Sequence, residues 1–279
     1  MKKDWKKPGR DVRAASARPR HQPQAGQRPP HAQADSPFRR PAAELAVLYG
    51  VHPVREALRM KRRKLLTLFA TEAAAARLSA EIAESGVPVQ IVDGARLDQQ
   101  LGRDAVHQGL MLEARPLPAL DIADIASDGG TLLVLDQITD PHNVGAILRT
   151  AAAFAVRGLV MTDRHAPALD GVLAKSASGA LEHVPIASVV NLARALDEIG
   201  ALGFRRIGLD SDGEADLRRI ADPQPVALVL GAEGSGLRRL TRERCDAVAR
   251  LSLPGAIRSL NVSNACAVAL AMLQQDPTH

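Results

Sequence analysis

Hydrophobic and polar positions alternate with the periods of helices and strands from about residue 45 to the C-terminal end of the chain. Between residues 45 and 114 the pattern predicts helices at 51–60, 71–86 and 95–102 and strands at 65–70, 87–92 and 107–114. Further along it predicts strands at 131–136, 158–162, 184–188, 204–209, 225–230 and 247–251, and helices at 143–155, 170–179, 191–201, 236–243 and 261–274. This alternation is typical of an α/β fold in which helices cover both faces of a parallel sheet.

Composition divides the chain into four parts. Residues 1–43 are rich in Arg, Lys, Pro, Gln and His and hold almost no large apolar residue, which predicts a disordered basic tail. Residues 44–115 are predicted to form a small α/β domain. Residues 116–130 are predicted to be a linker, because they are rich in acidic residues and end in Gly-Gly. A larger α/β domain follows over 131–279.

The positive charge is unevenly distributed. Residues 1–40 hold 11 Lys and Arg against 3 acids, which leaves 25 against 28 for the rest of the chain. The tail is either a salt-dependent contact to phosphate or a solvated extension. The basic run 61–64 allows the same two alternatives, a phosphate contact or a solvated turn. Aromatic residues are only 2% of the chain, so base stacking on aromatic side chains is disfavoured as a mode of nucleic-acid binding.

Several classes of protein are disfavoured by simple features. The two cysteines, Cys245 and Cys266, lack the spacing of metal ligands and indicate a reduced, cytoplasmic protein, so no metal is expected. No apolar run approaches the roughly 20 residues that cross a bilayer, and the basic N-terminal segment has no apolar stretch typical of a secretory signal.

Three stretches carry candidate chemistry. The first, DQITDPHNVGAILRTAAA, follows a short apolar strand, and in it Asn143 is expected to cap a helix on which Arg149 lies off the apolar stripe. By itself it is also compatible with an ordinary strand–turn–helix unit. The second, GAEGSGLRRL, follows the strand at 225–230 and places glycines around Glu233. Glycines after a strand let the backbone approach a ligand closely, although the spacing is that of neither common nucleotide-binding loop. By itself this loop is compatible with a nucleotide-like ligand or with a plain turn.

The third stretch, LSLPGAIRSLNVSNACAVALAML, places four polar residues at the start of a strongly apolar helix. One capping residue usually suffices there, so a bound polar ligand is a natural partner for the others.

Together, NVGAILRTA, LVLGAEGSG and SLNVS resemble, in this order, the three motifs of the SpoU (TrmH-type) RNA ribose 2'-O-methyltransferases. The upstream stretches YGVHPVREAL and VHQGLMLEA resemble the substrate-binding domain of the branch that methylates a guanosine of 23S ribosomal RNA. The resemblance implies a SPOUT domain with a C-terminal trefoil knot, preceded by a small domain related to ribosomal protein L30e. It also implies S-adenosylmethionine as cofactor, 23S ribosomal RNA as substrate and a homodimer whose active site is completed across the interface.

The resemblance further assigns site residues. Arg149 is implicated at the ribose 2'-hydroxyl, either as a base or as a clamp on a phosphate, and a guanidinium that stays protonated favours the clamp. The other catalytic positions are Asn143, Glu233, Ser259 and Asn261. The cofactor positions are Gly231, Leu251 and Leu260.

One departure from the family pattern concerns the third motif, because Pro254 in LSLPGA lies two positions later than the usual proline. This places the details of the adenine pocket in question. Two alternatives to the ribosomal RNA enzyme stay open: a SpoU-type methyltransferase acting on transfer RNA, and a non-catalytic RNA-binding or ribosome-assembly factor.

Overall fold

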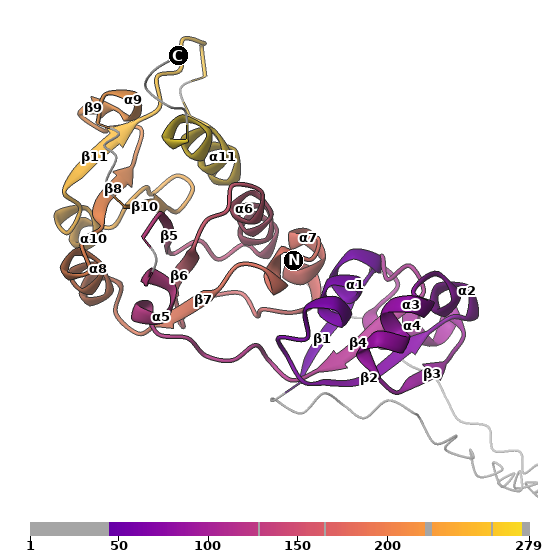
Figure 1. Cartoon of the computed structure of the whole chain (residues 1–279). Helices are drawn as coiled ribbons and strands as arrows, with labels where there is room; N and C mark the ends of the chain where they lie inside the picture. Colours follow the sequence, from indigo (N-terminus) through magenta and orange to yellow (C-terminus); the bar gives the residue numbers. More distant parts are fainter. Residues whose placement is uncertain (1–44, 128, 165, 221–224, 258, 275–279) are drawn as a thin grey trace, which may run out of the picture. The chain divides into compact units, whose positions relative to one another are not determined.

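The computed structural model describes residues 45–274 except 128, 165, 221–224 and 258 (Figure 1). The basic tail predicted for residues 1–43 lies outside the described residues. Within the described part no helix is both long and apolar enough to cross a membrane.

The N-terminal part of the described chain forms a four-stranded sheet in the order β1-β4-β2-β3. Strand β4 pairs antiparallel with β1 and β2, while β2 and β3 are parallel. The strands are β1 (Ala46–Tyr49), β2 (Leu65–Ala70), β3 (Val89–Ile91) and β4 (Leu110–Ala114), and the helices are α1 (Val51–Met60), α2 (Glu72–Arg77), α3 (Ser79–Ser85) and α4 (Gly94–Leu101).

The C-terminal part forms a seven-stranded, wholly parallel sheet in the order β7-β6-β5-β10-β8-β11-β9. Its strands are β5 (Thr131–Asp136), β6 (Gly158–Thr162), β7 (Ile186–Val189), β8 (Arg205–Leu209), β9 (Ala215–Asp216), β10 (Val226–Gly231) and β11 (Ala247–Arg250). The connecting helices are α5 (Ile122–Ala126), α6 (Pro141–Ala153), α7 (Gly171–Ala177), the 3-10 helix η1 (Ala180–Glu182), α8 (Leu192–Ala201), α9 (Leu217–Ile220), α10 (Arg239–Glu243) and α11 (Val262–Leu273).

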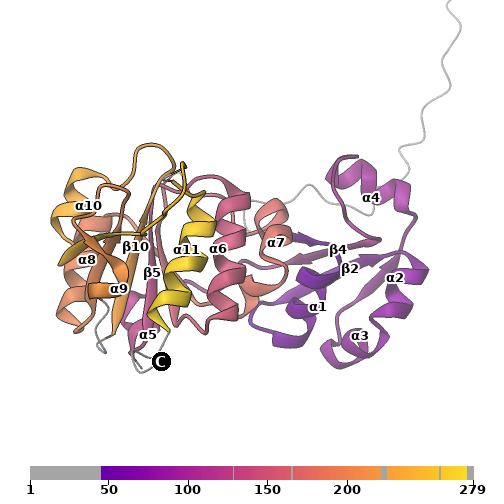
Figure 2. The same ribbon diagram turned by 90° about the horizontal axis from the view of Figure 1, so that it is seen from above.

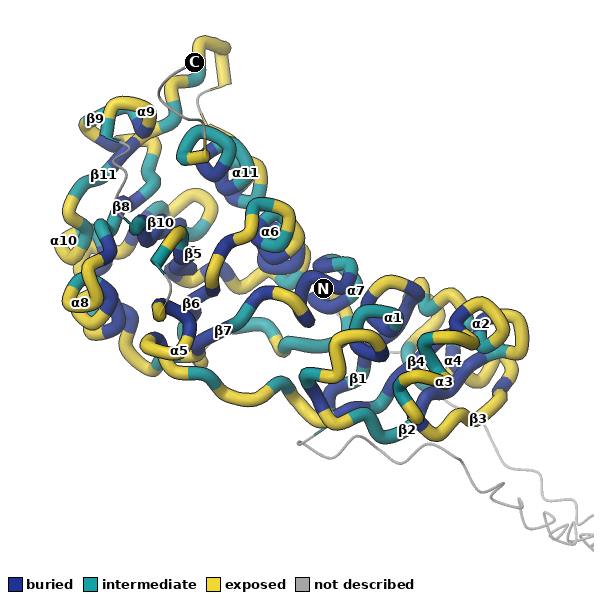
Figure 3. Tube along the Cα trace, in the orientation of Figure 1, coloured by how far each residue is buried: buried dark blue, intermediate teal, exposed yellow. Residues whose placement is uncertain are grey.

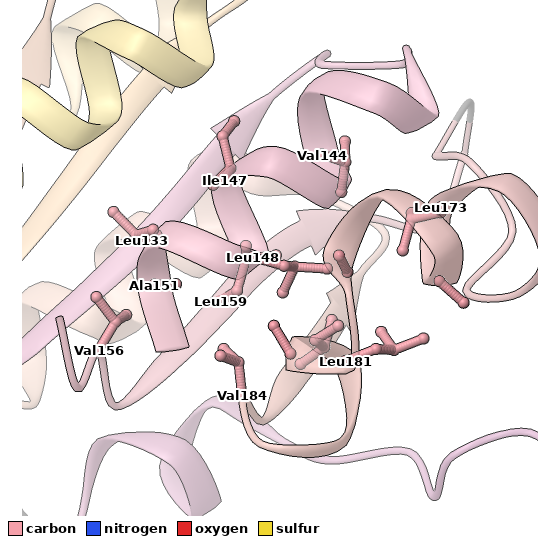
Figure 4. Packing of buried hydrophobic residues seen from close by; sticks show 14 of the residues in the cluster. Leu133, Val144, Ile147, Leu148, Ala151, Val156, Leu159, Leu173, Leu181 and Val184 are labelled. Atoms are coloured by element: carbon pink, nitrogen blue, oxygen red, sulfur yellow. The ribbon is translucent and has the colours of Figure 1, made fainter. Parts of the chain in front are cut away.

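Helices cover both faces of this sheet, which confirms the predicted α/β architecture. Helices α6, α7 and α11 lie on one face, and α5, α8 and α10 on the other (Figures 1 and 2). Successive residues of β5 point to opposite faces. Leu133 therefore packs beneath α6 with Ile147 and Leu148 (Figure 4), whereas Leu132 and Val134 belong to the apolar cluster under α8. The strands at the centre of the sheet are buried along almost their whole length (Figure 3).

Three local expectations differ from the structure. Helix α6 begins at Pro141, and its cap is Asp140, whose side chain accepts a hydrogen bond from the His142 N–H; the predicted cap at Asn143 is wrong. Proline suits the first helical position because its missing N–H needs no partner there. The helix predicted over 71–86 is interrupted at Leu78. The segment expected to be a linker contains α5, whose Ile122 and Ile125 are buried against the larger sheet.

The basic run 61–64 contributes an internal contact that neither sequence alternative described. Arg63 is buried, and its Nη2 lies 2.7 Å from Oε1 of Glu182, also buried, while Arg62 donates to the Glu182 carbonyl oxygen at 3.1 Å. Arg63 is therefore a structural residue and makes no surface contact to phosphate.

We expect Glu182→Ala to lower the free energy of unfolding by about 3 kcal/mol, because the buried Arg63 guanidinium then loses its ion-pair partner. Urea denaturation measures this change. The matched control is Glu243→Ala, which breaks an exposed pair with Arg239 and should cost less than about 1 kcal/mol. Equal effects of the two substitutions would contradict the prediction.

Candidate functional site

The central feature of the larger sheet is the place where the strand order reverses, between β5 and β10. In parallel sheets, ligands bind beyond the carboxyl ends of strands at such a point. The loops that leave β5 and β10 here carry the first and second candidate stretches. The turn before α11 brings the third stretch to the same edge.

Three of the predicted site residues join in one hydrogen-bonded cluster. Asn143 donates from Nδ2 to Oε1 of Glu233 at 3.1 Å, and Asn261 donates from its own Nδ2 to Oδ1 of Asn143 at 3.0 Å. Oε1 of Glu233 also accepts from Asn261 Nδ2 and, at 3.4 Å, from the backbone N–H of Val262. One carboxylate oxygen thus links α6, the loop after β10 and the start of α11.

The local structure explains why these side chains meet. Asn143 lies in the first turn of α6, so its amide is held near the end of β5. Asn261 is the cap of α11, and its Oδ1 accepts from the Ser263 N–H at 2.9 Å. That bond leaves the Nδ2 of Asn261 available for the Glu233 carboxylate.

A cavity of about 390 Å³ lies beside this cluster, beyond the carboxyl ends of β8, β10 and β11. The three residues predicted to bind the cofactor, Gly231, Leu251 and Leu260, all line it, as do Glu233 and Ser259. The other lining residues are Leu209, Asp210, Ser211, Leu230, Ala232, Gly234, Gly236, Leu253, Val262 and Ala265.

The glycines of the β10 loop are required by close backbone contact. A Cβ atom on Gly231 would lie 2.3 Å from the carbonyl carbon of Gly236 and 2.6 Å from the Leu237 nitrogen. Gly236 itself has a φ of 64°, in the left-handed region that favours glycine. A larger residue at either position would therefore force the loop beside the cavity into another conformation.

Arg149 is placed differently from the other predicted residues. It is exposed on α6, does not line the cavity, and makes no hydrogen bond or ion pair with any residue that the structure describes. Its guanidinium therefore has no partner among the described residues and can bind a ligand.

Sequence reasoning missed Asp210, which lines the cavity from the end of β8. Its Oδ2 lies 3.4 Å from Nη1 of Arg242 and accepts from the Leu237 N–H at 3.4 Å. The available signal was its position, since a carboxylate directly follows the predicted strand 204–209. Its pairing with a loop about 27 residues away in the sequence could not be read from that position.

The buried thiol on α11 is a poor candidate for chemistry. Burial raises the pKa of Cys266 to about 12, so the thiol is protonated at neutral pH. The described residues also contain no group of three or more His, Cys, Asp or Glu side chains arranged to hold a metal ion.

We expect Glu233→Ala to lower the single-turnover rate of the methyl transfer implied by the three motifs by about 10- to 100-fold, because hydrogen bonds to a charged group contribute roughly 1.5–3 kcal/mol and three donors share this oxygen. Tm should change little, since Glu233 is exposed. Single-turnover kinetics and thermal unfolding measure the two effects. Glu214→Ala, at another exposed carboxylate, is the control. An unchanged single-turnover rate would show that the cluster is not needed for methyl transfer.

The fold and the site together define an α/β protein with a ligand cavity at the carboxyl edge of a parallel sheet. The SpoU rRNA Methylase family matches residues 130–271, and the RNA 2'-O ribose methyltransferase substrate binding family matches residues 47–120. The chain belongs to the SpoU family and is an RNA methyltransferase.

Individual relatives agree with this assignment. A Synechocystis protein described as an uncharacterized tRNA/rRNA methyltransferase is 37% identical over 236 residues, which are 81% of this chain and 61% of that relative. The 23S rRNA (guanosine-2'-O-)-methyltransferase RlmB of Yersinia pestis is 36% identical over 80% of this chain and 94% of its own. The AdoMet-bound rRNA methyltransferase of Sinorhizobium meliloti has a TM-score of 0.71 at 24% identity, over 82% of this chain and 87% of that one, which shows a common fold.

Proposed function

We propose that this chain transfers a methyl group from S-adenosylmethionine to the ribose 2'-hydroxyl of a guanosine in 23S ribosomal RNA. The observation that carries the proposal is the cavity that joins Gly231, Leu251 and Leu260 beside the cluster of Asn143, Glu233 and Asn261. The ribosomal substrate is supported by relatives such as the Yersinia pestis enzyme. The cytoplasmic location inferred from the sequence stays a prediction.

The cavity suits the cofactor in size and chemistry. Binding pockets for small molecules are about 300–1,000 Å³ and mostly apolar with a few fixed polar groups. Leu209, Leu251 and Leu260 provide apolar walls for an adenine ring, while the backbone at Gly231 provides hydrogen-bonding groups at close range. Asp210 is the carboxylate available to a ribose hydroxyl or a cationic group of the cofactor. When bound, S-adenosylmethionine supplies an electrophilic methyl group on a sulfonium.

The protein's own task is to position a ribose hydroxyl for in-line attack. Glu233 holds the amides of Asn143 and Asn261 in fixed orientations, and Ser259 lines the cavity next to them. We assign these four residues to orienting the ribose and the cofactor through hydrogen bonds.

We assign Arg149 to the RNA, where it clamps a phosphate and polarises the attacking hydroxyl. A guanidinium remains protonated at neutral pH, so stabilisation of negative charge is its natural role. Because Arg149 lies outside the cavity of its own chain, this role fits a homodimer in which the active site is completed across the interface. Light scattering after gel filtration tests the homodimer.

The remaining parts of the chain receive the roles expected from the family. We propose that residues 44–115 form an L30e-like domain that binds the RNA substrate, joined by 116–130 to the methyltransferase domain 131–279. We further propose that the methyltransferase domain is knotted at its C-terminal end. The match of the substrate-binding family to residues 47–120 supports the first of these roles.

The test has two steps. Isothermal titration with S-adenosylmethionine first tests the cofactor, and an absence of binding would contradict the proposal. Mapping of 2'-O-methyl positions in ribosomal and transfer RNA, from cells with and without the protein, then identifies the substrate. Loss of one guanosine methylation in 23S RNA is the expected result, and a loss confined to transfer RNA would favour the tRNA enzyme.

A further inference from the structure

We propose that a second cavity in the larger domain binds a nucleotide of the RNA substrate other than the one that is methylated. Arg238 and Arg239 would hold its phosphate, and Val190 and Leu240 would contact its sugar or base. This inference rests on the proposed RNA substrate and adds to it a binding site on a different part of the sheet edge.

The cavity has a volume of about 390 Å³ and lies at the carboxyl ends of β6 and β7, next to the start of α10. Its lining residues are Thr162, Val190, Asn191, Leu192, Ala193, Arg238, Arg239, Leu240 and Thr241. It shares none of them with the cofactor cavity, which lies at the ends of β8, β10 and β11. The volume is within the range of small-molecule pockets and accommodates one nucleotide.

Arg238 is oriented for a ligand by a buried carboxylate. Its backbone N–H donates to Oδ2 of Asp136 at 3.0 Å, and its Nε donates to Oδ1 at 2.5 Å. The Asp136 side chain is fully buried, whereas that of Arg238 is 45% exposed. The two Nη nitrogens of Arg238 make no hydrogen bond with any residue in the described part of the chain, so both remain available as donors.

Arg239 adds a second, more exposed cation. Its Nη1 lies 2.6 Å from Oε1 of Glu243, but the two side chains are 77% and 52% exposed. An exposed pair of this kind contributes only about 0–1 kcal/mol, so a phosphate can replace the carboxylate at little cost. Two guanidinium groups at one cavity favour a phosphodiester, which Arg binds through paired hydrogen bonds.

The apolar part of the cavity distinguishes a nucleotide from a simple anion. Val190 is 74% exposed and Leu240 is 52% exposed, and both line the cavity that holds the two arginines. An inorganic phosphate would leave these side chains in water. The sugar and base of a nucleotide would cover them, and Asn191 offers an amide to a base edge because its Oδ1 already accepts from the Arg194 N–H.

The bond between Asp136 and Arg238 fixes the position of this cavity relative to the loops that carry Asn143 and Glu233. Asp136 ends β5 just before the segment that leads into α6, and Arg238 follows the glycine loop of β10. An RNA strand held at Arg238 is therefore held against the scaffold that carries Asn143 and Glu233. The cavity should govern RNA affinity and leave cofactor affinity unchanged.

The experiment compares Arg239→Ala and Leu240→Ala in the full chain, since both side chains are exposed and Arg238 keeps its bond to Asp136. Binding of unmodified 23S RNA transcribed in vitro is measured by filter binding at several salt concentrations. We expect Arg239→Ala to weaken binding about 5- to 10-fold and to reduce the slope of log K against log salt by roughly 0.7–0.9, the value for one phosphate contact. Leu240→Ala should weaken binding at least threefold without a change in slope.

The control is Arg244→Ala, an exposed arginine paired with Asp197 at 3.2 Å that lines neither cavity; binding should change less than twofold. S-adenosylmethionine affinity and Tm should stay at the wild-type values in all three variants. If Arg239→Ala and Leu240→Ala bind RNA as Arg244→Ala does, while the wild type binds and methylates RNA, the nucleotide site is wrong and the proposed function stands. An effect of Arg239→Ala alone means general attraction to phosphate and also overturns the site.

Two further outcomes are informative. Displacement of the RNA from the wild type by micromolar guanosine monophosphate, lost in Leu240→Ala, would assign the cavity to a free nucleotide and overturn the proposal. A wild-type protein that binds S-adenosylmethionine but neither binds nor methylates 23S or transfer RNA refutes the proposed function, and the nucleotide site with it.

Discussion

Arg149→Ala is expected to lower the rate of methyl transfer by about 10³-fold or more, with S-adenosylmethionine binding unchanged. Removing a group that stabilises developing negative charge, or that assists proton removal, costs about 10²–10⁴-fold. Cofactor binding should survive because Arg149 does not line the cavity. Single-turnover transfer of a labelled methyl group to RNA and calorimetric titration of the cofactor measure the two quantities.

The choice of control follows from the position of Arg149, an exposed arginine with no partner among the described residues. Arg219 is also exposed and lies in the same domain, on α9, so Arg219→Ala tests the general loss of one positive charge. Arg149→Lys separates charge from shape, because lysine keeps the charge but lacks the planar fork that binds phosphate. Turnover of Arg149→Ala close to that of Arg219→Ala would exclude Arg149 from the reaction.

Gly231→Ala is expected to lower the affinity for S-adenosylmethionine by about 100-fold. The added Cβ would lie 2.3 Å from a backbone carbon of Gly236 and 2.6 Å from the Leu237 nitrogen, so the loop must move away from β10. Moving it disturbs the cavity wall and Glu233 together. Displacements of about 1 Å at a binding site can cost roughly 100-fold, and here both binding and orientation are affected.

Gly255→Ala is the matched control for this substitution. Gly255 precedes the third motif, is exposed, and has no atom within 4 Å of the position that a Cβ would occupy. Its substitution should leave the cofactor affinity within about twofold. Titration calorimetry measures both variants, and circular dichroism checks that each is folded. Wild-type affinity in a folded Gly231→Ala protein would show that the cofactor does not use this loop.

Most of the strands of the larger domain were predictable, because strands buried on both faces appear as short apolar runs between polar turns. The predicted strand at 131–136 agrees with β5 residue by residue, and that at 204–209 differs from β8 by one residue. The first residue of a helix was harder to predict where two residues could serve as its cap. Asp140 and Asn143 are both good caps, and Pro141 at the first helical position selects Asp140.

The candidate site was predicted in part. The order of the three motifs predicted that Asn143, Glu233 and Asn261 belong to one site. In the structure, Asn143 and Asn261 both donate to the same carboxylate oxygen of Glu233. Asp210 and the pair of Asp136 with Arg238 were missed. Each depends on a contact between segments far apart in the chain, which neither residue type nor spacing reveals.

The sequence by itself determined the alternation of helices and strands, because local periodicity follows from which face of each element must be buried. Its three motifs also determined the family. Only the tertiary structure decided that Arg63 is buried against Glu182, that Asp136 holds Arg238, and that Arg149 lies outside the cavity of its own chain. These outcomes depend on strand order and on long-range packing, and many strand orders are compatible with one pattern of apolar positions.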